Sequence, residues 1–177
     1  MSLGNKSDLR VLICMANGQA AIGARAVFKE QGAASYIVVD NNREALERMK
    51  ADSFNLVLIE DTFPDVGGID FSRYIRFLNA PLSVAPIVYA MKEPSRETVM
   101  EARNAGVTKM IVMPFTTASL VKNLESILDD PQPFIRVTGY YGPCRRMQAG
   151  GHKGPERRLK QQGVFPVENL RKVFKGA

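Results

Sequence analysis

The sequence predicts an α/β protein built on a doubly wound parallel sheet. Five short apolar runs suited to buried strands alternate with five segments whose apolar residues recur at helical spacing. Parallel strands need long crossover connections, which helices supply. The best-defined strand covers residues 56–59 and stops at two carboxylates, Glu60 and Asp61. In an open α/β sheet, ligands bind at this end of the strands.

The other elements follow from local patterns along the chain. We expect strands at residues 9–15, 36–39, 56–59, 86–91 and 109–113, and helices at residues 20–29, 43–50, 69–78, 95–104 and 117–128. Gly32 stands where a helix C-terminus favours glycine, and Asp40 and the pair Asn41-Asn42 stand where they can cap the next helix. Pro64 and the pair Gly67-Gly68 predict a loop after the third strand.

Length and charge divide the chain into three parts. Its 177 residues suit a leader (1–8), one domain (9–130) and a basic extension (131–177). The extension holds ten Lys or Arg and two Asp or Glu, a net +8, whereas the first 130 residues hold 14 and 16, a net −2. The two cysteines make no disulfide framework, and no apolar run approaches the ~20 residues of a membrane span. The polar start predicts a cytoplasmic protein with no membrane partner.

The extension is rich in proline and glycine. Pro131, Pro133, Gly139, Gly142 and Pro143 are expected to break any regular element, and residues 131–177 to add nothing to the core. Its aromatic side chains can pack on the chain's own domain or on a neighbouring one. The residues expected at such an interface are Phe134, Tyr140, Tyr141, Arg145, Arg146, Arg157 and Arg158.

The spacing around the third strand carries a family resemblance. Pro64 and Gly68 lie four and eight residues after Glu60, Ala105-Gly106 precedes the fifth strand, and Pro114-Phe115 follows it. Over residues 9 to about 129 the chain resembles the CheY-like receiver domains of two-component response regulators. The resemblance implies the flavodoxin-like (βα)5 fold, a five-stranded parallel sheet, here with a basic C-terminal extension. It also implies a part in phosphorelay signal transduction.

The resemblance also says which residues should carry phosphoryl chemistry, and this sequence departs from all of them. The phosphoacceptor position is Glu60, the Mg²⁺-binding acidic pair maps to Met15 and Ala16, the hydroxyl to Met91, the lysine to Met113 and the aromatic switch residue to Met110. A thioether cannot replace an oxygen ligand or an ammonium group. We therefore expect no catalytic residue, no metal and no cofactor. Met15, Met91 and Met113 should instead form one apolar patch beside Glu60.

Glu60 itself has two interpretations. Its longer side chain could imitate a phosphorylated aspartate, although the lysine and hydroxyl that would answer its charge are absent. We expect it instead to be a partly solvated loop carboxylate. Asp61 could add one oxygen ligand, but two adjacent carboxylates make a poor Mg²⁺ site.

The sequence as a whole predicts a degenerate receiver that is not an enzyme. The chain has a single histidine, His152, and no phosphate-binding glycine loop, so hydrolytic triads and nucleotide sites lack support. The expected partners are other signalling proteins, with a possible homodimer through residues 95–128. The alternative is a nucleic-acid-binding regulator whose basic extension contacts phosphates. A working receiver with unusual residues ranks last.

Overall fold

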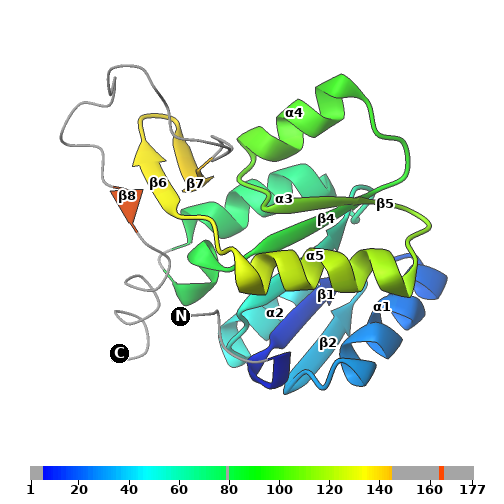
Figure 1. The fold of residues 1–177 in the computed structure, drawn as a ribbon. Helices are drawn as coiled ribbons and strands as arrows, with labels where there is room; N and C mark the ends of the chain where they lie inside the picture. Colours follow the sequence, from blue (N-terminus) through cyan, green and yellow to red (C-terminus); the bar gives the residue numbers. More distant parts are fainter. Residues whose placement is uncertain (1–5, 79, 145–163, 166–177) are drawn as a thin grey trace.

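The computed structural model describes residues 6–78, 80–144 and 164–165 of the chain. Its centre is a parallel sheet of five strands in the order β2-β1-β3-β4-β5 (Figure 1). The strands are β1 (Arg10–Cys14), β2 (Ser35–Val39), β3 (Leu56–Glu60), β4 (Ile87–Met91) and β5 (Lys109–Val112). The helices are α1 (Gly18–Glu30), α2 (Asn42–Ala51), α3 (Gly67–Phe77), α4 (Arg96–Asn104) and α5 (Thr117–Asp129). The predicted doubly wound fold is thereby confirmed.

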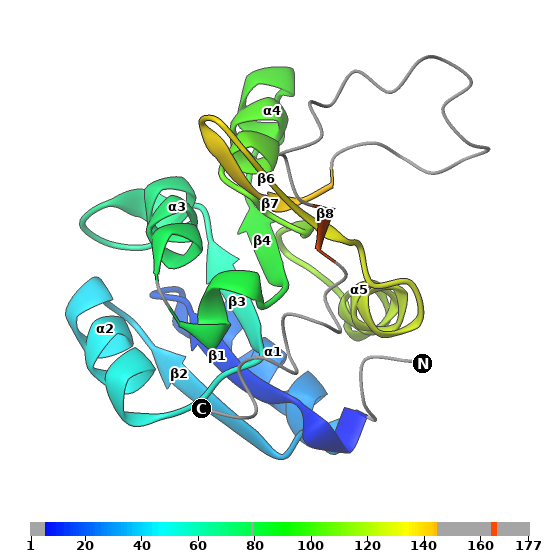
Figure 2. The same cartoon turned by 90° about the vertical axis from the view of Figure 1, so that its left-hand side faces the viewer.

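The helices cover both faces of the sheet and create two cores. One core joins alternate strand residues to α1 and α5, and the other joins the remaining strand residues to α2, α3 and α4. Figure 2 shows α2 and α3 on one side of the sheet and α1 and α5 on the other. Buried on both faces, β3 and β4 consist of buried residues throughout, which explains their unbroken apolar runs.

Helix starts follow the capping signals of the sequence. Among the expected capping residues Asp40, Asn41 and Asn42, the structure selects Asn41. Its side chain accepts a hydrogen bond from the amide of Glu44 and caps α2. Ser95 and Thr116 form capping boxes at α4 and α5. Gly32 takes a positive φ of 73° after α1, where a helix C-terminus favours glycine.

The expected loop at Gly67-Gly68 needs correction, because α3 begins at Gly67. A Cβ on Gly68 would lie 2.2 Å from the carbonyl oxygen of Glu60 and 2.9 Å from Cε2 of Tyr89. The Gly68 amide also donates to the carbonyl of Asp61. Glycine is therefore required here so that the first turn of α3 can pack directly on the end of β3.

The extension contains regular structure that proline and glycine were expected to prevent. Strands β6 (Phe134–Val137) and β7 (Tyr140–Pro143) form an antiparallel hairpin, and β8 (Val164–Phe165) pairs with the other edge of β6. Gly139, with a φ of 77°, occupies the two-residue turn, and Pro143 lies in the edge strand β7, where a missing amide is tolerated. The expectation that residues 131–177 add nothing to the core is also wrong, since Phe134 is buried. The sequence also favours one amphipathic helical stretch at residues 167–174, which lies outside the described residues.

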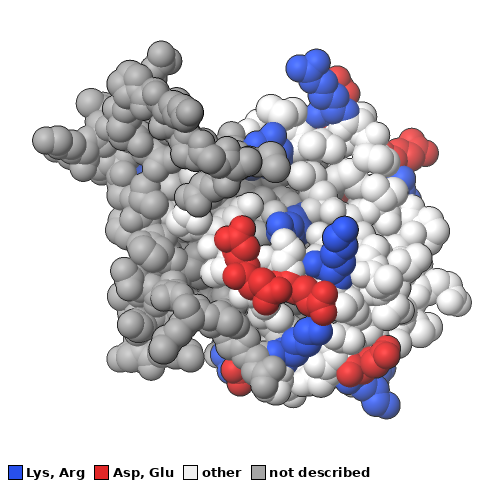
Figure 3. Space-filling view, viewed as in Figure 1, with Lys and Arg blue, Asp and Glu red and all other residues white. Residues whose placement is uncertain are grey.

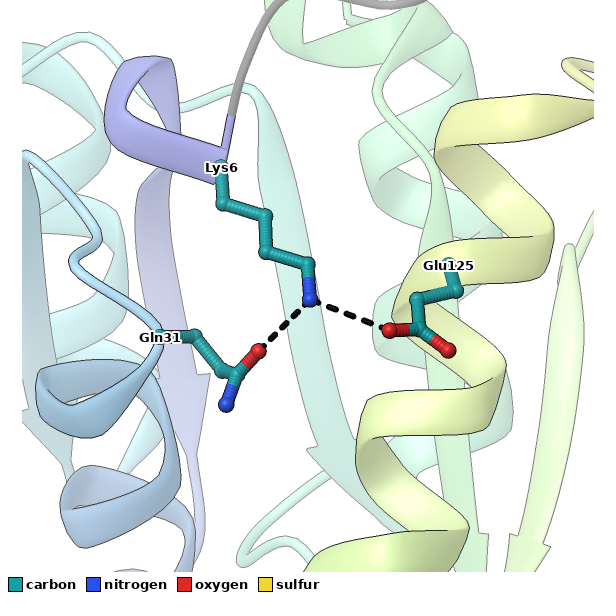
Figure 4. A network of polar contacts seen from close by, with 3 residues as sticks. All are labelled: Lys6, Gln31 and Glu125. Atoms are coloured by element: carbon teal, nitrogen blue, oxygen red, sulfur yellow. Dashed lines mark hydrogen bonds and ion pairs between the residues drawn. The ribbon is translucent and has the colours of Figure 1, made fainter.

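The start of the described chain is joined to the domain by polar contacts. A short 3-10 helix, η1 (Lys6–Asp8), precedes β1. The ammonium of Lys6 donates to Oε1 of Gln31 at 2.7 Å and to Oε1 of Glu125 at 3.1 Å, and so joins the end of α1 to α5 (Figure 4). An exposed ion pair such as Lys6–Glu125 contributes about 0–1 kcal/mol.

The face of the described residues that carries α5 has a mixed charge (Figure 3). Figure 3 shows Lys or Arg and Asp or Glu side chains interspersed on the face that carries α5, rather than a field of one sign. None of the helices in the described part of the chain is long and apolar enough to cross a membrane.

Candidate functional site

The carboxyl ends of β1, β3 and β4 and the residue after β5 form one edge of the sheet, here called the carboxyl edge. It carries the positions that the sequence singled out. Glu60 is the last residue of β3 and pairs with Ala90, and Asp61 donates its amide to the carbonyl of Ala90. The amide of Met113 donates to the carbonyl of Met91 at 2.8 Å. The edge therefore brings the predicted site positions together from four strands.

Glu60 is the most unusual residue at this edge. Its side chain is only 1% exposed, so the expectation of a partly solvated loop carboxylate is wrong. Oε1 accepts hydrogen bonds from the amides of Ala16 at 2.6 Å and Asn17 at 3.3 Å, in the loop between β1 and α1. Oε2 is buried and has no hydrogen-bond partner among the described residues. A carboxylate in this place stabilises the loop that leads into α1, because the two backbone amides form charge-assisted hydrogen bonds with it.

The methionines of the edge do not form one patch. Met15 and Met113 pack in the core beneath α1 and α5, whereas Met91 packs in the core beneath α2, α3 and α4. The reason is the register: Met91 pairs with Val112, so Met113, one residue later, points to the opposite face. The expected single apolar patch beside Glu60 is therefore wrong, although Met91 and Met113 share the edge. Met110, the expected switch position, is half-buried and packs with the core of Met91.

A small polar cluster at the same edge was missed from the sequence. One oxygen of Asp61 accepts the amide of Lys92 at 2.8 Å, and the other accepts the amide of Thr62 at 2.7 Å. The ammonium of Lys92 donates to the Thr62 hydroxyl at 3.3 Å. The available signal was the position of Lys92, directly after the predicted fourth strand. The cluster joins the loop after β3 to the loop after β4.

Tyr89 lies beneath this cluster, inside β4. It is 3% exposed, and Gly68 of α3 approaches its ring. Burial, together with the nearby charges of Asp61 and Glu101, raises the pKa of Tyr89 to about 12. The phenol is therefore neutral at every physiological pH and acts as a packing residue.

The donor set of the edge does not fit a hard divalent cation. Mg²⁺ binds oxygen ligands in near-octahedral geometry, usually with one or two carboxylates. Here Oε1 of Glu60 already accepts hydrogen bonds from backbone amides. Met15 is buried among apolar residues, and the side chain of Ala16 has no atom that could bind a metal. Both oxygens of Asp61 already accept amides. No group of three His, Cys, Asp or Glu that could hold a metal occurs among the described residues.

The expected interface residues fall into two sets. Phe134 is 1% exposed and packs on Val84 and Tyr141, so for this residue the chain's own domain is the binding surface. Tyr140 and Tyr141 are half-buried in β7. The second set consists of four expected interface residues that lie outside the described residues: Arg145, Arg146, Arg157 and Arg158.

Comparisons with known proteins agree with this geometry. The family model described as the response regulator receiver domain matches residues 11–125. The chemotaxis protein CheY-3 of Vibrio cholerae serotype O1 is 34% identical over 90 residues, which cover 51% of this chain and 68% of that protein. The chemotaxis protein CheY of Pseudomonas aeruginosa is 27% identical over 113 residues, which cover 64% of this chain and 86% of that protein.

Solved structures show the same fold at lower identity. A two-component response regulator from Clostridium difficile superposes with a TM-score of 0.63 and 20% identity, covering 70% of this chain and 98% of that one. The receiver domain of a sensor histidine kinase from Pseudomonas aeruginosa, solved with a magnesium ion coordinated in its active-site cleft, gives a TM-score of 0.59 and 18% identity over 67% of this chain and 95% of that one. The chain therefore belongs to the family of CheY-like response regulator receiver domains of two-component signalling.

Proposed function

We propose that this chain is a degenerate receiver that signals through protein–protein contacts, without phosphorylation at the usual position. The orientation of Glu60 carries the proposal. A carboxylate that accepts a phosphoryl group must present a free oxygen to the phosphodonor. Oε1 of Glu60 is bound to two backbone amides, and Oε2 has almost no accessible surface. Glu60 in this arrangement is a support for the β1–α1 loop rather than a nucleophile.

The residues at the positions that should stabilise the negative charge of a transferred phosphoryl group support the same proposal. Phosphoryl transfer depends mainly on positioning and on electrostatic stabilisation of the transferring group. Met91 and Met113 stand in place of the hydroxyl and the lysine, and both pack into the cores. Lys92 supplies an ammonium at this edge, but it follows β4 rather than β5 and binds Thr62.

The proposed partners are other signalling proteins in the cytoplasm, with a homodimer as one form of such contact. Residues 95–128 are the proposed surface. They include two exposed apolar side chains, Met100 of α4 at 46% and Val112 of β5 at 50% exposure. Exposed apolar residues supply the desolvated contacts on which protein interfaces depend.

Two measurements test the proposal. Calorimetric titration with Mg²⁺ should give no saturable heat for the wild-type chain. The double variant Ala16→Asp/Glu60→Asp, which adds a carboxylate at position 16 and places the family's aspartate at position 60, should gain binding. Saturable Mg²⁺ binding by the wild type would contradict the proposal. Capture of a signalling partner on the immobilised chain should also be unchanged by Mg²⁺ and acetyl phosphate. Salt-dependent retention of nucleic acid in place of a protein would favour the alternative, a phosphate-binding extension.

A further inference from the structure

The described structure contains a buried guanidinium that plays no part in the site above. Arg76, in the last turn of α3, is 3% exposed. Its Nε and Nη2 donate to the carbonyl of Gly106 at 3.0 and 2.8 Å, and its Nη1 donates to the carbonyls of Ser83 and Ala85, both at 2.8 Å. Backbone carbonyls thus satisfy four donor contacts of a charge that has been removed from water.

The hairpin of the extension completes the enclosure of this charge. The ring of Phe134 in β6 lies 5.0 Å from Cζ of Arg76, a cation–ring contact shielded from solvent. The ring of Tyr141 in β7 meets that of Phe134 edge-on at 5.9 Å. Burial lowers the pKa of Arg76 to about 9, and Tyr140 and Tyr141 oppose this lowering, so the guanidinium remains charged at neutral pH. The hairpin and Arg76 are therefore one packing unit.

Two glycines bring three backbone segments together at this point. Gly106, in the turn between α4 and β5, has a φ of 83°, and a Cβ there would lie 2.9 Å from Cγ of Arg76. A Cβ on Gly142 of β7 would lie 3.0 Å from Cα of Gly106. The α4–β5 turn is thus held between the side chain of α3 and the backbone of the hairpin.

The carbonyls that Arg76 binds precede β4 and β5. Ser83 and Ala85 lie just before β4, which begins at Ile87, and Gly106 lies just before β5, which begins at Lys109. The starts of the two strands are also bonded to each other, because Thr108 donates its amide to the carbonyl of Ile87 at 2.9 Å and accepts the amide of Ile87 at 3.1 Å. Arg76 therefore fixes both strand starts from one side while the hairpin covers it from the other.

We propose that the β6–β7 hairpin is a docked strap, and that its seating on Arg76 couples the C-terminal extension to the starts of β4 and β5. A partner that binds the extension and lifts the hairpin would admit water to Arg76, weaken its carbonyl contacts and loosen both strand starts. The coupling would give the extension a route into the receiver that does not pass through Glu60. It is thus independent of whether the carboxyl edge accepts a phosphoryl group.

Hydrogen exchange followed by NMR on the full chain tests the strap. Phe134→Ala removes the ring over Arg76, and Val137→Ala, at a half-buried position of the same strand, is the matched control. We expect exchange of the Arg76 Nε proton and of the Ile87 and Thr108 amides to rise at least about tenfold in Phe134→Ala, because a desolvated cation–ring contact is lost. The central Leu58 amide of β3 should change much less, and Val137→Ala should leave all four near wild-type values.

Two outcomes would overturn the proposal. If Phe134→Ala speeds exchange at Arg76 but leaves Ile87 and Thr108 unchanged, the hairpin covers the charge without coupling to the strands. If all four protons, Leu58 included, accelerate by one factor, the variant has lost global stability instead. Should Phe134→Ala fail to fold, Phe134→Leu keeps the apolar volume without the ring face, and the same differential pattern is required of it.

Discussion

The contact between α3 and the end of β3 predicts a large effect from a one-carbon change, Gly68→Ala. Gly68 has no positive φ, so alanine is compatible with its backbone and would gain about 1 kcal/mol from helix propensity. The new Cβ, however, would lie 2.2 Å from the carbonyl oxygen of Glu60, a backbone atom that cannot rotate away. Overpacking costs about 1–3 kcal/mol, and so close an approach belongs at the upper end. We expect a net loss of about 2 kcal/mol in the free energy of unfolding.

The assay for this prediction is urea unfolding followed by circular dichroism, with midpoints compared at constant slope. Gly23→Ala is the matched control, since Gly23 lies within α1 and a Cβ there would meet no atom within 4 Å. That variant should gain about 0.5–1 kcal/mol from helix propensity alone. If Gly68→Ala is as stable as the wild type while Gly23→Ala is stabilised, the close packing of Gly68 on the Glu60 carbonyl is refuted.

Three further predictions follow from single side chains. Glu60→Ala should lose about 1–3 kcal/mol, because two loop amides lose their acceptor, while Glu60→Gln, which keeps an acceptor oxygen, should lose less, as urea unfolding will measure. The pKa of Tyr89 is raised on folding to about 12, so the contribution of Tyr89 to stability should be constant below about pH 10 and be lost as the pH rises toward about 12. Tyr89→Phe should reduce the fall in stability that unfolding experiments measure across this range. Asn41→Ala should cost about 1 kcal/mol in thermal or urea unfolding, because α2 loses its N-cap.

The sequence was sufficient for the main sheet because its strands are buried. Runs such as residues 56–59 are apolar on both faces, so strand identity depends on local composition rather than on distant partners. Helix caps are equally local, so Asp40, Asn41 and Asn42 were recognised as the cap of α2, although the sequence left open which of them caps it. The spacing from Glu60 to Gly68 has a direct physical basis in the close approach of α3 to β3.

The β6–β7 hairpin and the burial of Glu60 were not predicted, because both depend on contacts with residues elsewhere in the chain. Proline and glycine in the extension were taken as breakers, although Gly139 between two β-rich segments is itself a hairpin signal. Arg76 occupies the buried stripe of α3 with Phe71 and Ile75, but its carbonyl partners come from two other segments. The direction of the Glu60 side chain likewise depends on amides 43 and 44 residues away.

We propose that Glu60 supports the β1–α1 loop and does not accept a phosphoryl group. The most direct test is incubation of the full chain with acetyl phosphate and Mg²⁺, followed by intact-mass measurement and peptide mapping. A phosphorylatable receiver treated in parallel shows that the phosphodonor is active. We predict that the mass of this chain stays unchanged; a stable gain of one phosphoryl group, mapped to Glu60 or to the neighbouring Asp61, would contradict the account.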